Sequence, residues 1–326
     1  MNRILSGMRP TGKLHLGHLV GALDNWVKLQ DQNDCFFMIA DWHALMSEYE
    51  APSVISESIF DNLVDWLASG IDPDKSVIFI QSEVTHHLEL YMIFSCFTPL
   101  GWLERCPTYK EQLRQLAHRN IKTYGFLGYP ILQAADILLY KANRVPVGED
   151  QLPHLELTRE IARRFNNLYR KEIFPDPQAL LTVFPRLLGL DNRKMSKSFN
   201  NTIDLSNSPD TTRKQVCNMV TDPKRIRLND PGHPEECNVF SYYKVFVPSK
   251  EKEANHWCTN AELGCTDCKA VLADNLIERL NIHQKKRKLW AGDKAQLKGI
   301  LKQGCQKAND LASQTIKEAK QLIGMS

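Results

Sequence analysis

The stretch ILSGMRPTGKLHLGHLVGALDNWVKL, residues 4–29, decides the fold of the first half of this 326-residue chain. It opens with the apolar residues Ile4 and Leu5, passes through a turn that contains Gly7 and Gly12, and continues as a helical pattern over residues 16–29. This order predicts a strand, a loop and a helix. The loop delivers the chain to a helix N-terminus, where unpaired backbone N–H groups and the positive end of the helix dipole bind phosphate oxygens. The stretch therefore predicts an α/β domain with a nucleotide-binding loop.

Two histidines stand at the start of this helix, in the string HLGH at residues 15–18. His15 and His18 are three residues apart around the first turn, so both side chains can donate hydrogen bonds to one phosphate chain as its charge redistributes. The alternative is a pair of surface histidines without a ligand. A second string, KMSKS at residues 194–198, weighs against that alternative.

The KMSKS string lies in a polar segment after Gly189, which predicts a mobile surface loop. When a carboxylate attacks the α-phosphorus of ATP, negative charge builds on the departing pyrophosphate. Lys194 and Lys197 would stabilise that charge if the loop closes on it in the transition state. The alternative is a solvated basic turn.

The pairing of HLGH with KMSKS resembles the two signatures of the class I aminoacyl-tRNA synthetases. Between the two strings, GYPILQAADILLY at residues 128–140 and VPVGEDQLPHLELTREIARRFN at residues 145–166 are similar to the bacterial tryptophanyl-tRNA synthetases. The similarity extends over the first half of the chain and beyond, to the KMSKS string, and resumes more weakly in the C-terminal part. It implies a Rossmann-like, parallel-sheet α/β domain that binds ATP, followed by a C-terminal helical domain.

The resemblance implies an ATP site built from three segments. One of them, GEDQ at residues 148–151, follows the apolar segment Val145–Val147 and opens a helix, so it should lie at the carboxyl edge of the sheet, where ligands bind. Asp150 would accept hydrogen bonds from the ribose; alternatively, Glu149 and Asp150 only cap the helix. The implied catalytic residues are His15, His18, Lys194 and Lys197, and the implied ATP-binding residues are Arg9, Thr11, Gly17, His18, Gly148, Asp150, Lys194, Met195, Ser196 and Lys197.

Asp136 is the residue predicted to select the amino acid. It interrupts an apolar run over residues 131–139, and a buried carboxylate needs a hydrogen-bond partner. The indole N–H of tryptophan is a donor only, and one carboxylate oxygen satisfies it; an ion pair with Arg144 is the alternative. His43 would line the same pocket, unless it is an ordinary hydrogen-bonded core histidine. The resemblance surrounds the amino acid with Leu5, His43, Tyr129, Gln133, Asp136, Val145, Val147 and Gln151.

The tyrosyl-tRNA synthetases are the nearest rival family, because Tyr129, Gln133 and Asp136 would have counterparts there. A phenol hydroxyl both donates and accepts, so it needs a second polar partner, which that family usually supplies as a tyrosine on the first strand. This chain has Leu5 at that place, which favours tryptophan. An alternative of another kind is a synthetase-like paralogue that binds RNA or senses redox state without aminoacylation.

Four of the nine cysteines, Cys237, Cys258, Cys265 and Cys268, follow a C-x20-C-x6-C-x2-C spacing. No signal peptide opens the sequence, so a cytoplasmic protein is expected, in which clustered thiols bind metal more often than they form disulfides. Four thiolates suit a zinc ion or a four-iron four-sulfur cluster, and four thiols without a metal are the remaining alternative. Only Cys265 and Cys268 form a close pair, which favours iron–sulfur. A subset of bacterial tryptophanyl enzymes carries such a cluster with nearly this spacing, and the resemblance implies one here.

The expected organisation has three parts: a catalytic domain over residues 1–187 with a helical insertion near 85–126, a KMSKS loop and linker over 188–205, and a helical anticodon-binding domain over 206–326. A net charge of +3 is too small to predict RNA binding by itself, and no membrane-spanning run appears. The resemblance implies that tryptophan and ATP, with Mg2+, give tryptophanyl-adenylate, and that tRNA(Trp) then accepts the acyl group on its terminal 2′-hydroxyl. It also implies a homodimer.

Overall fold

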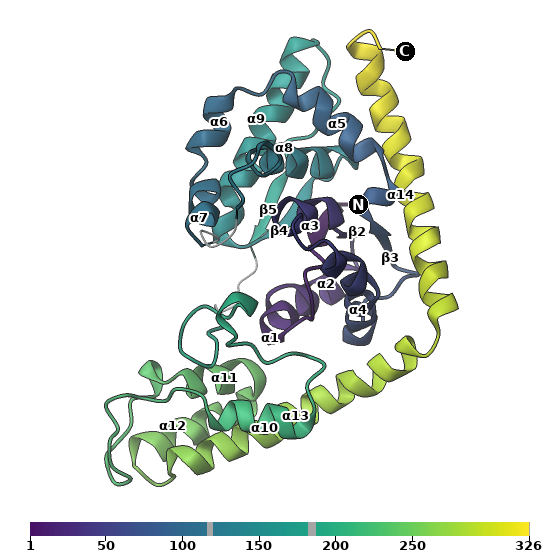
Figure 1. The fold of residues 1–326 in the computed structure, drawn as a ribbon. Helices are drawn as coiled ribbons and strands as arrows, with labels where there is room; N and C mark the ends of the chain where they lie inside the picture. Colours follow the sequence, from purple (N-terminus) through teal and green to yellow (C-terminus); the bar gives the residue numbers. More distant parts are fainter. Residues whose placement is uncertain (116–119, 182–186, 326) are drawn as a thin grey trace.

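A computed structural model of the chain describes residues 1–115, 120–181 and 187–325, and a five-stranded parallel sheet lies at the centre of its first half (Figure 1). The strands are β1 (Arg3–Met8), β2 (Asp34–Ile39), β3 (Ser76–Ile80), β4 (Arg144–Val147) and β5 (Gln178–Leu181). Their spatial order is β3-β2-β1-β4-β5, and every neighbouring pair is parallel. The order reverses between β1 and β4, which is the place where open α/β sheets bind ligands. This confirms the predicted Rossmann-like fold.

Both faces of the sheet are buried, as is usual for parallel strands. Along β2, Cys35, Phe37 and Ile39 join the core on one face, and Phe36 and Met38 join the core on the other. Figure 1 shows α5, α8 and α9 on one side of the sheet and α1, α2 and α4 on the opposite side. The helices of this half, with two short 3-10 turns, are α3 (Asp41–Glu48), α4 (Ser53–Ser69), η2 (Gln81–Glu83), α5 (His86–Ser95), α6 (Leu100–Arg105), α7 (Pro107–Gln115), α8 (Tyr124–Leu139), η3 (Glu149–Gln151) and α9 (Leu152–Leu168).

The first strand, loop and helix form where the sequence predicts them. After β1, the loop leads to α1 (Leu16–His18), which continues through the π-helical turn η1 (Leu19–Leu23) into α2 (Asp24–Leu29). The apolar residues of this helix are buried in the core beneath the sheet. A π-helical turn inside an α-helix often marks a functional site. Here it brings Gly21 and Ala22 to the wall of a cavity.

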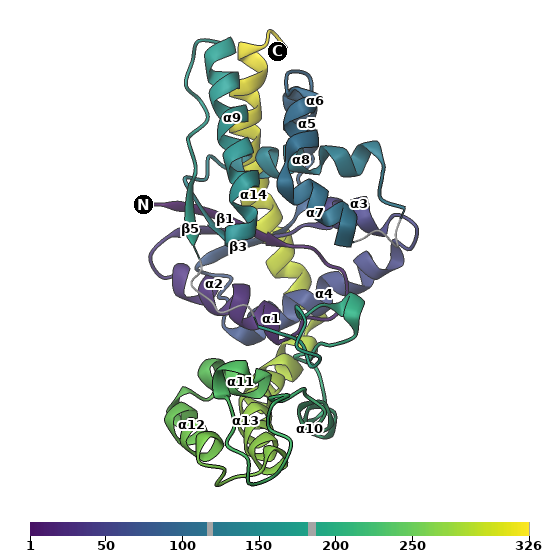
Figure 2. The same ribbon diagram turned by 90° about the vertical axis from the view of Figure 1, so that its left-hand side faces the viewer.

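The second half of the described chain is helical, as predicted, and most of it forms a separate body beside the sheet domain (Figure 2). Its elements are the 3-10 turn η4 (Lys197–Phe199) in the KMSKS string, α10 (Pro209–Cys217), η5 (Pro234–Glu236), α11 (Asn238–Phe246), η6 (Pro248–Lys250), α12 (Glu251–Thr259), α13 (Cys265–Ala291) and α14 (Lys294–Leu322). The predicted domain limits at 187 and 206 and the insertion at 85–126 stay predictions. Residues 116–119, 182–186 and 326, which fall inside those predicted ranges, lie outside the described residues.

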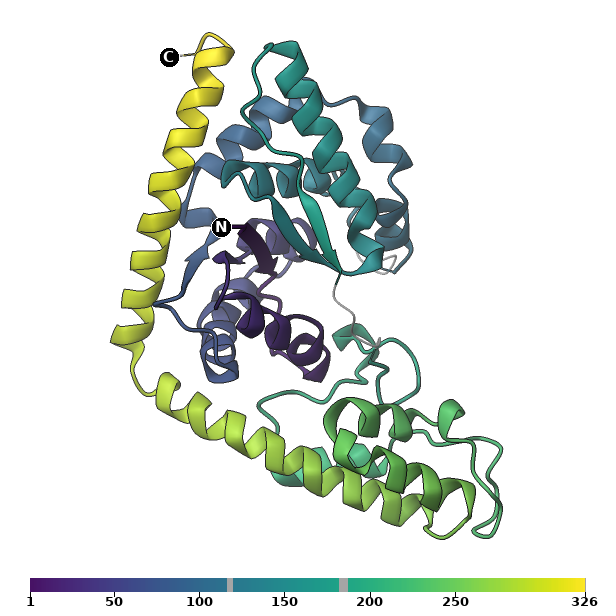
Figure 3. The ribbon, with the colours of Figure 1, turned by 180° about the vertical axis from the view of Figure 1, so that it is seen from behind.

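The last helix returns to the first domain. α13 and α14 meet at an elbow, from which α14 runs along the sheet domain (Figure 3). α14 packs on the edge strand β3, and the Cα of Gly304 lies so close that a β-carbon there would stand 1.8 Å from the carbonyl oxygen of Ile78. The backbone N–H of Ile80 points to the Sγ of Cys305 at 3.5 Å. Among the described helices, none has the length and apolar character that a membrane span requires.

Candidate active site

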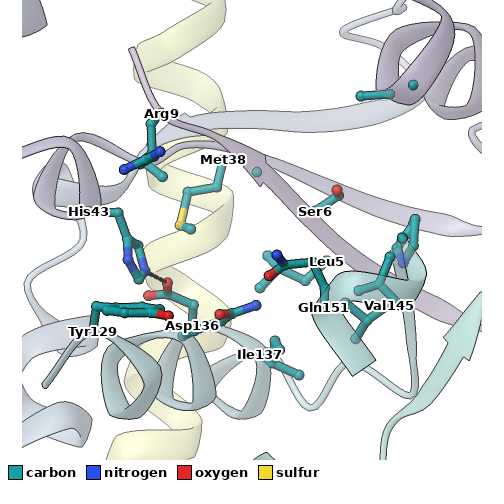
Figure 4. A pocket seen from close by; sticks show the side chains of 18 of the residues that line it. Leu5, Ser6, Arg9, Met38, His43, Tyr129, Asp136, Ile137, Val145 and Gln151 are labelled. Carbon is teal, nitrogen blue, oxygen red and sulfur yellow. Dashed lines mark hydrogen bonds and ion pairs between the residues drawn. The ribbon is translucent and has the colours of Figure 1, made fainter. Parts of the chain in front are cut away.

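A cavity of about 390 Å3 opens at the carboxyl edge of the sheet, where the strand order reverses (Figure 4). Its volume is within the range of small-molecule sites. The cavity is lined by all eight residues predicted to surround the amino acid: Leu5, His43, Tyr129, Gln133, Asp136, Val145, Val147 and Gln151. Arg9 and Gly148, predicted for ATP, line the same cavity. Predicted residues from four separate segments of the sequence therefore meet at one site.

Asp136 is buried in the cavity wall, with 2% of its surface exposed. Its carboxylate accepts hydrogen bonds from His43 Nε2 at 2.7 Å, Gln81 Nε2 at 2.8 Å and His87 Nδ1 at 2.6 Å. These donors, and not Arg144, are its partners. Burial raises the pKa of Asp136, but the charge of His43 and the hydrogen bonds from both histidines outweigh it and hold the pKa below its ordinary value. Asp136 is therefore an ionised acceptor at neutral pH.

Tyr129 faces the same cavity, and its hydroxyl lies 2.8 Å from Nε2 of the buried His154. Burial, with a smaller contribution from His43, lowers the pKa of His154 to about 4, so its ring is neutral at neutral pH. Sequence reasoning missed His154, because it reads as one more residue of the helix α9.

The HLGH histidines form their own hydrogen-bonded cap at the start of α1. Their ring centroids are 3.8 Å apart. His15 Nδ1 accepts from the backbone N–H of Gly17 at 3.1 Å, and His18 Nδ1 accepts from the backbone N–H of His15 at 3.1 Å. Because Nδ1 is an acceptor in both rings, the proton of each neutral ring is on Nε2. Burial, then Lys197, lowers the pKa of His15 to about 4, and burial, His15 and Lys197 together lower the pKa of His18. The pair thus offers two uncharged N–H donors.

The KMSKS string lies against HLGH because the segment that follows it runs antiparallel to residues 14–16. Leu16 N–H donates to the carbonyl of Ile203 at 2.9 Å, and Leu205 N–H donates to the carbonyl of Leu14 at 2.9 Å. Lys197 Nζ then reaches the first loop and donates to the carbonyl of Thr11 at 3.1 Å.

The other residues of KMSKS differ in exposure. Met195 is buried, and a β-carbon on Gly17 would stand 3.4 Å from its Sδ. Ser196 is half-buried and its backbone N–H donates to Asn201, whereas the side chain of Lys194 is exposed. The two predicted strings, which are about 180 residues apart in the sequence, are therefore neighbours in the fold.

Asn201 holds the KMSKS string in shape and was missed by sequence reasoning. Its side chain accepts from the backbone N–H of Ser196 at 2.8 Å and donates to Asp191 at 2.7 Å and to the carbonyl of Lys194 at 3.1 Å. Gly189 makes room for it, because a β-carbon there would lie 2.2 Å from the amide group. In the sequence, Asn201 is only one polar residue in a polar loop, and nothing there indicates its hydrogen bonds.

The GEDQ segment forms the predicted strand-to-helix turn. Gly148 is the N-cap of η3 and Gln151 is the N-cap of α9, so neither Glu149 nor Asp150 occupies a capping position. Asp150 instead accepts from Gln151 Nε2 at 3.2 Å. This leaves the alternative of a simple helix cap without support.

The four clustered cysteines line a second, small cavity of about 20 Å3. Cys237 is the N-cap of α11, Cys258 lies in α12, and Cys265 and Cys268 lie in the first turn of α13. Gly232 packs against Cys258, since a β-carbon there would lie 2.3 Å from its Sγ. Within residues 1–115, 120–181 and 187–325, no group of three or more His, Cys, Asp or Glu side chains is arranged to hold a metal ion.

Comparison with known proteins agrees with this geometry. Residues 1–281 match the family model of the class I tRNA synthetases (W and Y). The chain is 50% identical to the tryptophan–tRNA ligase of Thermotoga maritima and 40% identical to that of Ralstonia nicotianae, covering 99% and 98% of those proteins and 99% of this chain in both cases.

Solved structures give the same result. The crystal structure of Campylobacter jejuni tryptophanyl-tRNA synthetase, complexed with ADP and tryptophan, superposes with a TM-score of 0.88 at 36% identity and covers 99% of both chains. The fold, the cavity and these full-length similarities lead to one conclusion: the chain belongs to the class I tRNA synthetases of the tryptophan and tyrosine family.

Proposed function

We propose that the chain is a tryptophan–tRNA ligase and that the cavity at Asp136 is its tryptophan site. The observation that carries this proposal is an ionised carboxylate in the wall of a cavity that also presents apolar side chains, Leu5, Val145 and Val147 among them. An indole ring needs apolar contacts and one acceptor for its N–H. Gln151, Gln133 and Tyr129 supply polar groups for the ammonium and carboxylate of the amino acid.

In the proposed first step, a carboxylate oxygen of tryptophan forms a bond to the α-phosphorus of ATP, and the bond to pyrophosphate breaks. ATP brings Mg2+, which neutralises phosphate charge. His15 and His18 donate through Nε2–H to the phosphates, Lys194 and Lys197 stabilise the departing pyrophosphate, and Asp150 accepts from the ribose. The remaining ATP contacts are assigned to the first loop, the two strings and the GEDQ turn, namely Arg9, Thr11, Gly17, Met195, Ser196 and Gly148.

In the second step, the 2′-hydroxyl of the terminal adenosine of tRNA(Trp) takes the acyl group, and AMP leaves. No covalent enzyme intermediate is required. Catalysis rests on positioning and electrostatics.

ATP–pyrophosphate exchange with tryptophan and with tyrosine, measured separately, tests this function. Exchange that depends on tryptophan alone is the expected result. Exchange with tyrosine would mean that Leu5 is a poor guide to the substrate, and exchange with neither would favour the non-catalytic paralogue.

The pH dependence of kcat/KM for ATP should report the deprotonation of Lys197. Burial lowers the pKa of Lys197 to about 8; Arg9 adds to this effect and Asp204 opposes it. Since the charged lysine is the active form, kcat/KM should be level near pH 7 and fall about tenfold per pH unit well above pH 8. A Lys197→Arg variant, whose guanidinium stays charged, should have lower activity but no such fall. A fall at the same pH in this variant would assign the titration to another group.

We also propose that Cys237, Cys258, Cys265 and Cys268 hold a four-iron four-sulfur cluster, with zinc as the alternative. Four thiols from three helices line one cavity, which is the donor set that either centre needs. Cysteine ligation of a cluster would tie α11, α12 and α13 together at their ends.

The Cys265→Ser variant tests the centre. Anaerobically purified wild-type chain should be brown and hold about four iron and four sulfide per chain, and the variant should lose both the visible absorbance and the iron. Cys96→Ser, which changes an exposed cysteine of the sheet domain, is the matched control and should keep them. If the wild-type chain is colourless and holds about one zinc, the centre is the zinc alternative and the cluster assignment is wrong.

A homodimer completes the proposal. Large apolar side chains are exposed on neighbouring segments of the 85–126 region, with Met92 at 62%, Leu100 at 61% and Tyr124 at 74%. An apolar groove lined by Trp42, Leu88 and Tyr91 includes the chain neighbours of Met92 and Tyr124. Light scattering tests whether the mass in solution is twice the 37.4 kDa of one chain.

A further inference from the structure

Two residues that do not line the cavity, Gln81 and His87, donate hydrogen bonds to Asp136. Gln81 lies directly after β3, and His87 lies in the first turn of α5; both are fully buried. Gln81 Nε2 and His87 Nδ1 both donate to the same carboxylate oxygen, Oδ1. His43, which does line the cavity, donates to the other oxygen, Oδ2.

A carboxylate offers about two acceptor positions on each oxygen. Gln81 and His87 fill both positions of Oδ1, so the position that remains is on Oδ2, the oxygen next to His43. The carboxylate cannot rotate to exchange its oxygens without breaking two buried hydrogen bonds. The arrangement therefore presents one acceptor of fixed direction to the cavity.

The two donors are themselves fixed. Gln81 Oε1 accepts from the backbone N–H of His43 at 3.4 Å, which sets its amide so that Nε2 faces Asp136. His87 Nε2 lies 2.7 Å from the hydroxyl of Tyr140. Because an ionised carboxylate only accepts, the His87 proton must be on Nδ1, and the Tyr140 hydroxyl then donates to Nε2. The ring of His87 also stacks on Phe79, with centroids 6.0 Å apart.

We infer that Gln81 and His87 are positioning residues for amino-acid selection: they orient the Asp136 carboxylate so that its remaining acceptor position faces the cavity and receives the indole N–H. The inference rests on the proposed function, in which Asp136 binds that N–H. Neither residue touches the substrate, so each acts through Asp136.

The test compares tryptophan with β-(benzothiophen-3-yl)alanine, in which sulfur replaces the indole N–H, in ATP–pyrophosphate exchange. Gln81→Met keeps the shape of the side chain but removes its donor. His87→Leu removes the other donor, and His87→Asn restores an N–H near the place of Nδ1. Each removal should lower kcat/KM for tryptophan by about 10-fold to 100-fold, as expected for a hydrogen bond to a charged group, and change that for the analogue less than about 3-fold. His87→Asn should recover most of the loss.

Equal losses for the two substrates in Gln81→Met and His87→Leu would indicate a general role in the fold and overturn the inference. If His87→Leu does not fold, Gln81→Met still tests the inference. An unchanged KM for ATP shows that a variant is folded. Asp136→Asn separates the two proposals: if it leaves the ratio between tryptophan and the analogue unchanged, the indole contact itself is wrong. If it collapses the ratio while the Gln81 and His87 variants do not, the inference fails and the proposed function stands.

Discussion

Replacing Lys197 by alanine is expected to lower kcat for tryptophanyl-adenylate formation by about 10^3-fold, with a much smaller change in KM for ATP. The lysine is half-buried beside the HLGH turn and donates to the carbonyl of Thr11. Its charge interacts most strongly with pyrophosphate as the P–O bond breaks, so its loss raises the barrier more than it weakens ATP binding. Steady-state ATP–pyrophosphate exchange at saturating tryptophan measures both constants.

The matched control for this prediction is Lys13→Ala. Lys13 is a lysine of the same loop as Thr11, and its side chain is exposed. That variant should keep kcat within about 2-fold, as is usual for a surface substitution. A Lys197→Ala enzyme with normal kcat would remove the KMSKS string from the catalytic assignment.

Replacing Asp136 by asparagine should lower kcat/KM for tryptophan by about 10^3-fold, in the range measured when one member of a buried charged pair is removed. Three donors, from His43, Gln81 and His87, converge on its two oxygens. An asparagine has one oxygen and an NH2 group, so at least one donor would face another donor, and the acceptor for the indole N–H would be lost or misdirected.

Exchange assays over a range of tryptophan concentrations, with KM for ATP as an internal check on folding, measure this loss. The unfolding temperature of the variant should also fall, because a buried donor is left unpaired. Normal kcat/KM for tryptophan in a folded Asp136→Asn enzyme would contradict the assignment of the cavity.

The sequence was a good guide to the site where the signal is local. Each strand-to-helix turn, at HLGH and at GEDQ, has its glycine, its apolar strand and its helix within a short segment. Parallel strands bring all such turns to one edge, so their meeting at one site could be predicted. The individual cavity residues were named from the resemblance to the tryptophanyl-tRNA synthetases. The same reasoning predicted the parallel sheet and the helical second half.

The residues that sequence reasoning missed act through distant partners. Gln81, His87 and Asn201 are ordinary polar residues in the sequence, and their roles depend on hydrogen bonds to groups on other elements or on the far side of a loop. His87 and Asp136 are 49 residues apart, and no periodicity links them. The docking of α14 on β3 was missed for the same reason: an amphipathic helix shows which of its faces is buried, but not against what.

The position of α14 determines how the chain would respond to damage at the elbow. Residues 291–293 are exposed, and a protease can reach an exposed connection of this kind. A chain cut there would keep α14 only through its packing on the sheet domain, mainly on β3, α5 and α8, and through ion pairs such as Lys141 with Glu318. Once α14 leaves, the free edge of β3 becomes a template for strands of other molecules. A single cut far from the ATP site would then cause aggregation. The enzyme would be lost from solution although the geometry of its catalytic residues was still intact.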